Sequence, residues 1–246
     1  MSGHSKWHNI RLRKGAQDAG RAKLFAKVTR EVIVAVKQGG GDPNANPRLR
    51  TAIDKAREVS MPNDNIQRAI RRGTGEEGGA NYEEVTYEGY GPGGVALYIE
   101  TATDNRNRTV ADLRHTLGRY GGSLGESGCV AWLFERKGII TLEASLEEEQ
   151  LMEVVLEAGA DDLSRQNGTF EVVTAFDSLE QVKSALTQHG IAPTSAQPAF
   201  VPKTTVALEG DQAQRIVRLM HALEDLDDVQ TVSANFDIPE ELLEAD

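Results

Sequence analysis

Cysteine and long apolar runs are both scarce in this 246-residue sequence, and each shortage excludes a class of protein. The single cysteine, Cys129, excludes an internal disulfide and suits a reducing compartment, so we expect the protein in the cytosol. The longest aliphatic run, Val32 to Val36, is far too short to cross a bilayer, and no apolar block follows the basic N-terminus as in a secretory signal. With 39% hydrophobic and 26% charged residues, the composition predicts a soluble globular protein with no membrane partner.

The common catalytic motifs are also missing, because the sequence has no Walker A, HExxH or CxxC pattern. Residues 89–94 match the GxGxxG dinucleotide fingerprint, but Pro92 interrupts it and a strand is expected where a helix is required. Residues 121–125 match the GxSxG pattern of a nucleophile elbow. The expected helix precedes them and the expected strand follows, whereas the elbow requires a strand before the turn and a helix after it. His4 and His8 have no Cys or carboxylate close by and make an incomplete zinc set. We therefore expect no enzyme: no catalytic residue, no metal and no cofactor.

What the sequence has in excess is charge that is segregated by sign. Residues 1–75 carry 16 Lys and Arg against 6 Asp and Glu, whereas the other 171 residues carry 11 against 32. The first segment therefore has a net charge of +10 and the remainder −21, although the chain as a whole is −11. Like charges crowded on a small domain repel one another, so this arrangement more often serves binding to a polyanion than folding. The pattern predicts a nucleic-acid-facing module on an acidic body.

Three short helices are expected in the basic segment. Residues 18–37 place their apolar side chains on one helical face and are followed by a run of three glycines, which ends the helix. A second helix is expected to begin at Pro47 with Asn46 as its N-cap, and a third to run over residues 62–73 with Gly73 as its stop. Together they predict a helical bundle with an N-terminal arm, assigned as domain 1–75.

The candidate nucleic-acid-binding residues lie in the arm, on the cationic face of the first helix and at the end of the third. They are Lys6, Trp7, Arg11, Arg13, Lys14, Arg21, Lys23, Lys27, Arg30, Arg71 and Arg72. The arm could wrap a phosphate backbone, with Trp7 available to stack on a base. Two plainer interpretations stay open. Trp7 could pack against the bundle, and long Lys and Arg stems commonly only solvate the outside of a bundle.

A second candidate anion site is the segment Asp104 to Thr109, between a strand end and a helix start. Arg106 and Arg108 lie beside free helix N–H groups, and together these donors could hold a phosphate or a carboxylate. The alternative is a polar turn in which Asn and Asp satisfy the backbone while both arginines pair with nearby acidic side chains. The sequence does not choose between them.

From residue 80 onward the pattern alternates between strands and helices, which favours split βαβ units of the ferredoxin-like kind. The predicted fold class is α+β: the N-terminal helical bundle followed by two α/β domains, the third inserted in the second. The middle domain is assigned to residues 80–137 plus 204–240 and the inserted domain to 138–203. Within them we expect a buried strand at Val130–Phe134 and another at Ile139–Leu142.

A helix that precedes these two strands and ends at Gly121 is expected to begin with a capping box, in which Thr109 is followed three residues later by Asp112. Cys129 is expected in an apolar strand, next to Val130 and Trp132, where a thiol is normally inert packing.

Four motifs spread along the chain resemble those of the YebC/PmpR family and occur in the same order. They are Gly3 to Trp7, Met61 to Gly73, Tyr87 to Gly94 and Thr103 to Thr109. Residues 125–134 and 232–237 fit as well, so the resemblance spans essentially the whole chain. Cys129 stands where a small polar residue is expected, which at a packing position affects no function.

The resemblance implies the three domains described above and a non-enzymatic regulator of gene expression. Members of the family are described as DNA-binding transcriptional regulators. Others, mitochondrial relatives included, resemble translation factors that act at the ribosome and relieve stalling on proline-rich stretches. The charge argument supports a nucleic-acid partner but does not choose between duplex DNA and ribosomal RNA. A third hypothesis is a protein–protein adaptor, whose acidic domains would recruit a basic partner.

Overall fold

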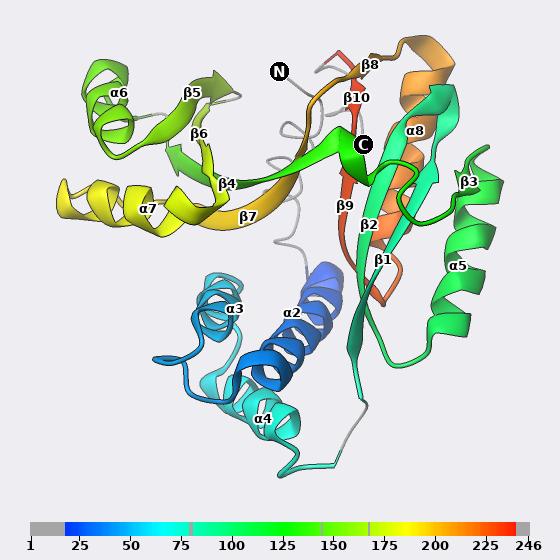
Figure 1. Cartoon of the computed structure of the whole chain (residues 1–246), viewed down its shortest axis with the longest axis horizontal. Coiled ribbons are helices and arrows are strands. Elements are labelled where there is room, and N and C mark those ends of the chain that lie inside the picture. The colour runs from blue at the N-terminus through cyan, green and yellow to red at the C-terminus, as the bar shows by residue number, and fades with distance from the viewer. Residues whose placement is uncertain (1–17, 79–80, 144, 167, 240–246) are drawn as a thin grey trace. The chain divides into compact units, whose positions relative to one another are not determined.

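The computed structural model describes residues 18–78, 81–143, 145–166 and 168–239. The chain divides into two compact units: the first takes residues up to Leu133 and again from Thr204, and the second is Phe134–Lys203. Figure 1 labels their helices and strands. In the described part of the chain, no helix is long and apolar enough to cross a bilayer.

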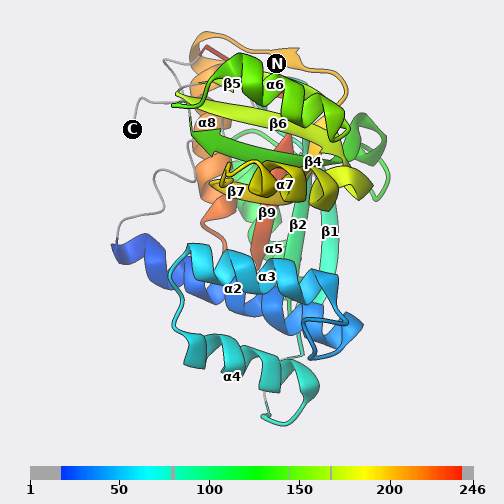
Figure 2. The ribbon, with the colours of Figure 1, turned by 90° about the vertical axis from the view of Figure 1, so that its left-hand side faces the viewer.

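In the described part of the first unit, three helices form a bundle: α2 (Asp18–Gly39), α3 (Pro47–Glu58) and α4 (Asn63–Thr74). The longest, α2, packs against both of the others (Figure 2). Its apolar face, including the fully buried Val32 and Ala35, meets Leu49 of α3 and Ile66 of α4 in one core. The predicted bundle is therefore present, and burial of one apolar stripe per helix holds it together.

Within the bundle, the expected starts of α2 and α3 and the end of α2 at the glycine run are confirmed, but the expected end of α4 is not. The Asn46 side chain accepts a hydrogen bond from the Leu49 amide at 3.0 Å, with Pro47 in the first turn, and α2 ends at the glycine run. Gly73 does not stop α4, however, because the helix continues to Thr74 and Gly75 is the residue with positive φ (86°). Gly73 instead lies inside the helix, facing Val36 of α2.

The remainder of the first unit is an antiparallel sheet with the strand order β3-β1-β2-β9. Its strands are β1 (Glu83–Tyr90), β2 (Ala96–Thr103), β3 (Ser123–Leu124) and β9 (Val229–Ala234). Two helices accompany the sheet and pack against each other, α5 (Arg106–Arg119) and α8 (Gly210–Glu224). Because β1 lies between β2 and β3, the succession β2, α5, β3 is a split βαβ unit.

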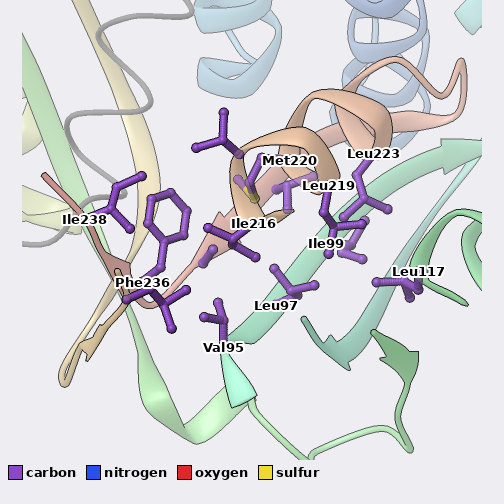
Figure 3. Close-up of a cluster of buried hydrophobic side chains, with 14 of the residues drawn as sticks. Val95, Leu97, Ile99, Leu117, Ile216, Leu219, Met220, Leu223, Phe236 and Ile238 are labelled. Atoms are coloured by element: carbon purple, nitrogen blue, oxygen red, sulfur yellow. The ribbon is translucent and has the colours of Figure 1, made fainter. Parts of the chain in front are cut away.

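A continuous apolar core joins this sheet to α8. Figure 3 shows Leu97 and Ile99 of β2 beside Ile216 and Leu219 of α8, and all four side chains are fully buried. Phe236 closes one end of this core from β10 (Phe236–Asp237), which pairs in parallel with β8 (Val206–Ala207). The two segments of the unit, far apart in sequence, thus share one core.

The second unit is a ferredoxin-like arrangement in which every strand pairing is antiparallel and the strand order is β5-β6-β4-β7. Its elements are β4 (Phe134–Glu143), α6 (Glu148–Glu157), β5 (Ala160–Gln166), β6 (Thr169–Ala175), α7 (Leu179–Gln188) and β7 (Ser195–Pro202). The two helices pack against each other and share a core with the sheet (Figure 1).

Several sequence-based boundaries in the α/β part are wrong. Val130–Phe134 is not a strand: Ala131–Leu133 form a short 3-10 turn, and one strand, β4, starts at Phe134 and runs through the expected Ile139–Leu142. Cys129 accordingly lies in a turn rather than in a strand. The buried Glu88 carboxylate organises this turn by accepting backbone N–H groups from Gly128, Val130 and Ala131 at 2.6–2.7 Å, which a strand would direct to a neighbouring strand.

Candidate nucleic-acid interface

The cationic face of α2 contacts the turn that follows α8, a segment nearly 200 residues away in sequence. Lys23 Nζ pairs with the Asp225 carboxylate at 3.0 Å, with both side chains more than half exposed. Lys27 is buried and donates to the Glu224 carbonyl at 2.5 Å. Arg30 donates to the Asp227 carbonyl, and its guanidinium also lies over the Tyr82 ring, 5.4 Å from its centroid.

This turn is an electrostatically favourable place for cations. Glu224 is the last residue of α8, and the final carbonyls of a helix lack intrahelical donors and carry partial negative charge. The carboxylates of Asp225 and Asp228 add full negative charge to the same turn. Lys27 therefore caps α8, and the three cations together join α2 to the turn that follows α8 within the first unit. Their helical spacing alone did not indicate this role.

Arg106 and Arg108 both pair with carboxylates. Arg106 makes a bidentate contact with the exposed Glu83, at 2.7 and 2.6 Å, and this hydrogen bonding lowers the pKa of the Glu83 carboxyl. Arg108 donates to Asp228 at 2.8–2.9 Å and to Asp104 at 2.8 Å, and these hydrogen bonds raise the pKa of its guanidinium. Of the two interpretations left open, the geometry is that of the paired polar turn.

The start of α5 is also earlier than the capping box placed it. Asn105, not Thr109, is the N-cap, and its side chain accepts a hydrogen bond from the Arg108 amide at 3.1 Å. Thr109 is buried within the helix and donates to the Asp228 carboxylate at 2.8 Å. The motif around Asp104 to Thr109 thus forms a structural network that converges on Asp228.

On the bundle, α4 presents cations that remain accessible. Arg68 and Arg72, four residues apart and therefore on one face, line a hollow of about 200 Å³ together with Thr29 and Asn65. Both arginines are exposed, and neither forms an ion pair with a carboxylate in the residues that the structure describes. The neighbouring Arg71 pairs with Glu77 at 2.7 Å, and that hydrogen bond lowers the pKa of the Glu77 carboxyl.

Arg68 was absent from the candidate set, although a sequence signal for it existed. Its spacing of four from Arg72 places the two guanidiniums on one helical face, whereas Arg71 and Arg72 point in different directions. Other candidates cannot be placed in this site. Lys6, Trp7, Arg11, Arg13 and Lys14 lie outside the described residues, and Arg21 is placed only as part of the α2 backbone.

Arginines on one helical face, beside an amide and a hydroxyl, can donate several hydrogen bonds to a phosphate and form bidentate contacts with it. Cys129 and the possible metal ligands among the described residues show no sign of reactivity or metal binding. Burial raises the pKa of the Cys129 thiol, which favours the unreactive thiol over the thiolate. Among the described residues, no group of three or more His, Cys, Asp or Glu side chains could hold a metal ion.

Comparisons with known proteins agree with this architecture. A family model described as the TACO1/YebC protein N-terminal domain matches residues 5–76, and one described as the TACO1/YebC second and third domain matches residues 82–236. The solved structure of the conserved hypothetical protein Aq1575 from Aquifex aeolicus is 48% identical, covers 90% of this chain and 92% of its own, and superposes with a TM-score of 0.84. This match confirms the predicted α+β fold class.

Relatives of nearly the same length carry a common name. A "Probable transcriptional regulatory protein" from Pelotomaculum thermopropionicum is 54% identical over 97% of this chain and 99% of its own length. A protein of the same name from Dictyoglomus turgidum is 53% identical over 100% of this chain and 99% of its own length. The family resemblance drawn from the four motifs is therefore confirmed.

Proposed function

This chain belongs to the TACO1/YebC family, and we propose that it is a non-enzymatic, cytosolic regulator of transcription that binds DNA through its helical bundle. The names of its relatives support a regulatory role, and the absence of the common catalytic motifs from the sequence supports a role other than catalysis.

The observation that carries the proposal is the pair of arginines on α4. Arg68 and Arg72 are exposed, form no ion pair with a carboxylate among the described residues and border a hollow with hydrogen-bonding groups, although their charges do act on the Glu77 carboxylate. A bound phosphate would replace water there without first displacing an internal ion pair. We propose that α4 contacts the phosphate backbone and that the basic N-terminal arm extends the contact, while Lys27 and Arg30 support the bundle from behind.

Contacts of this kind carry little sequence information, because phosphate groups are common to all sequences. The proposal therefore predicts binding that is strongly salt-dependent and weakly sequence-dependent. Each phosphate neutralised on B-DNA contributes about −0.9 to the slope of log affinity against log salt concentration.

The test is a salt titration of duplex DNA binding by the wild type and two double variants. Arg68→Gln with Arg72→Gln should weaken binding and flatten the slope by about 2, because two phosphate contacts are lost. Arg48→Gln with Arg57→Gln removes the same charge from the same bundle, but both arginines already pair with carboxylates, Glu84 and Asp54. An equal effect in both variants would mean that only net charge matters and would overturn the α4 site.

The polymer bound in cells is identified by crosslinking followed by sequencing of the recovered nucleic acid. Recovery of promoter DNA is the expected result. The alternative is a ribosome-associated translation factor that uses the same phosphate-binding surface and relieves stalling on proline-rich stretches. Recovery of ribosomal RNA, lost in the Arg68→Gln and Arg72→Gln variant, would replace the transcriptional assignment with this one.

A further inference from the structure

The second unit contains a groove that the proposed function does not use. It lies between α6, the end of α7 and the segment leading into β7, and its volume is about 420 Å³. Leu146, Val154 and Ile191 line it with partly exposed apolar side chains, above the buried Leu151. The groove thus has an apolar floor that is open to solvent.

The rim of the groove is acidic. Glu147, Glu153 and Glu157 border it, all exposed, and within the described residues none of them forms an ion pair. No Lys or Arg occurs in the sequence between Glu143 and Arg165, so the charge of α6 is not balanced locally. The whole of residues 134–203 has 12 Asp and Glu against 5 Lys and Arg, a net charge of −7.

This acidic helix face is unfavourable for the isolated fold. Glu149, Glu153 and Glu157 follow one another at intervals of four, and like charges at that spacing destabilise a helix by about 0.2–0.5 kcal/mol per pair. A bound cationic partner would reverse the sign of this contribution by placing opposite charge between the carboxylates.

We propose that this groove is a docking site for a basic, amphipathic segment of a partner protein. An apolar side chain of that segment would enter the hollow, and Lys or Arg residues on either side of it would meet Glu153 and Glu157. Charge complementarity selects this occupant, because the same carboxylates would repel a nucleic acid or an acidic peptide. The site is separate from the arginines of α4 and does not rest on the proposed nucleic-acid binding.

The test uses the full-length protein and a short fluorescein-labelled peptide in which Lys and Leu alternate in an amphipathic helical pattern. Fluorescence anisotropy near physiological salt should show saturable binding. Glu153→Gln with Glu157→Gln should weaken that binding about tenfold, because two complementary charges are removed from the rim. The matched control, Asp162→Asn with Asp177→Asn, removes two exposed charges of the same unit outside the groove and should change the affinity less than about twofold.

Three further measurements make the outcome decisive. A peptide with every Leu replaced by Ser keeps the charge but lacks the apolar anchor, and it should bind much more weakly. Backbone amide shifts on binding should concentrate at Leu146, Val154 and Ile191. Thermal unfolding should show that the Glu153→Gln and Glu157→Gln variant is at least as stable as the wild type. Equal binding of the two peptides, or equal loss in both double variants, would show diffuse attraction to an acidic surface and overturn the groove as a site.

Discussion

Lys27 of α2 donates a hydrogen bond from its buried ammonium to the backbone carbonyl of Glu224, the last residue of α8, at 2.5 Å. The two residues are 197 positions apart, so this contact joins the beginning of the chain to its final segment. A cation on a basic helical face, which the sequence pattern assigns to nucleic acid, is here part of the internal structure. The distinction can be measured, because a structural lysine and a binding lysine respond differently to substitution.

Replacing Lys27 by Met, which keeps the length of the side chain, should destabilise the protein by about 1.5–3 kcal/mol, because a hydrogen bond from a charged donor is lost. The measurement is urea unfolding followed by circular dichroism. Lys23→Met, one turn earlier on the same face, is the control. Its ion pair with Asp225 is exposed, and its loss should cost at most about 1 kcal/mol.

The same two variants also separate structural from binding roles. Lys27→Met should leave the salt dependence of nucleic-acid binding unchanged at temperatures where the protein is folded, because its ammonium is not at the surface. A flatter salt slope in Lys27→Met, with no loss of stability, would show instead that this lysine leaves Glu224 and contacts phosphate.

The ion pairs of Arg106 and Arg108 should also differ in how much they stabilise the fold, because Arg108 pairs with the buried Asp228 and Arg106 only with the exposed Glu83. Asp228 is buried and accepts hydrogen bonds from Arg108, Thr103 and Thr109, so Asp228→Asn should destabilise the protein by about 2–4 kcal/mol. Arg106→Gln removes only the exposed ion pair with Glu83 and should leave the unfolding midpoint nearly unchanged. Equal midpoints for Asp228→Asn and the wild type would contradict a structural role for the network.

The Glu88 carboxylate should make stability depend on pH. Burial by itself would raise its pKa, but hydrogen bonds from the amides of Gly128, Val130 and Ala131 outweigh that effect and hold the pKa below 4.5. The folded state therefore gains stability from ionised Glu88 above about pH 4.5, and this gain disappears as the pH falls through the lowered pKa.

Glu88→Gln tests this directly. Both carboxylate oxygens of Glu88 accept backbone N–H groups, whereas Gln has only one acceptor oxygen and places an NH2 donor where the other oxygen was. At pH 7 the variant should be less stable than the wild type by about 1–3 kcal/mol, and its amides at 128–131 should exchange hydrogen faster. The difference should shrink as the pH falls below 4.5, the ordinary pKa of the carboxyl. A difference that stays constant from pH 7 to pH 3 would exclude ionisation of Glu88 as its source.

Local signals in the sequence were sufficient to predict the presence of the helices, although not the end of α4 or the start of α5, and they did not predict the edges of the second sheet. Asn46 and Pro47 fix the start of α3 through their own chemistry, so no distant residue is needed to predict it. Strands β5 and β7 were not predicted. Both are edge strands of their sheet. β5 is rich in polar residues and β7 contains Pro198 and Pro202. An edge strand tolerates such residues, but they do not fit the apolar alternation by which strands are predicted from sequence.

The candidate nucleic-acid interface was also only partly predictable, because local spacing does not show long-range contacts. Spacing correctly placed Lys23, Lys27 and Arg30 on one side of α2, but it could not show that the turn Glu224–Asp228 lies against that side. Counting charges along the chain cannot reveal such long-range pairing. The partners of the α2 cations lie in the acidic part of the sequence, which the charge pattern had suggested was separate from the basic segment. Only the local spacing of Arg68 and Arg72 could have indicated the accessible pair in advance.

Gly73 gives a prediction in which two physical effects have opposite signs. Alanine has a higher helix propensity than glycine by about 1 kcal/mol, which by itself would make Gly73→Ala stabilising within α4. A Cβ at this position, however, would lie 2.6 Å from the Cβ of Val36 and 3.0 Å from the carbonyl oxygen of Ile33. Val36 is buried and β-branched, so it cannot rotate away, and overpacking of this kind costs about 1–3 kcal/mol.

We therefore expect Gly73→Ala to destabilise the bundle, with the packing cost exceeding the gain in propensity. Gly118→Ala in α5 is the matched control: a Cβ there meets no atom within 4 Å, so it should stabilise the protein by about 0.5–1 kcal/mol. Combining Gly73→Ala with Val36→Ala should recover part of the loss, and a double-mutant cycle from urea unfolding measures that coupling. If both glycine variants gain stability, or the cycle shows no coupling, then α2 and α4 do not pack as closely at Gly73 as the structure places them.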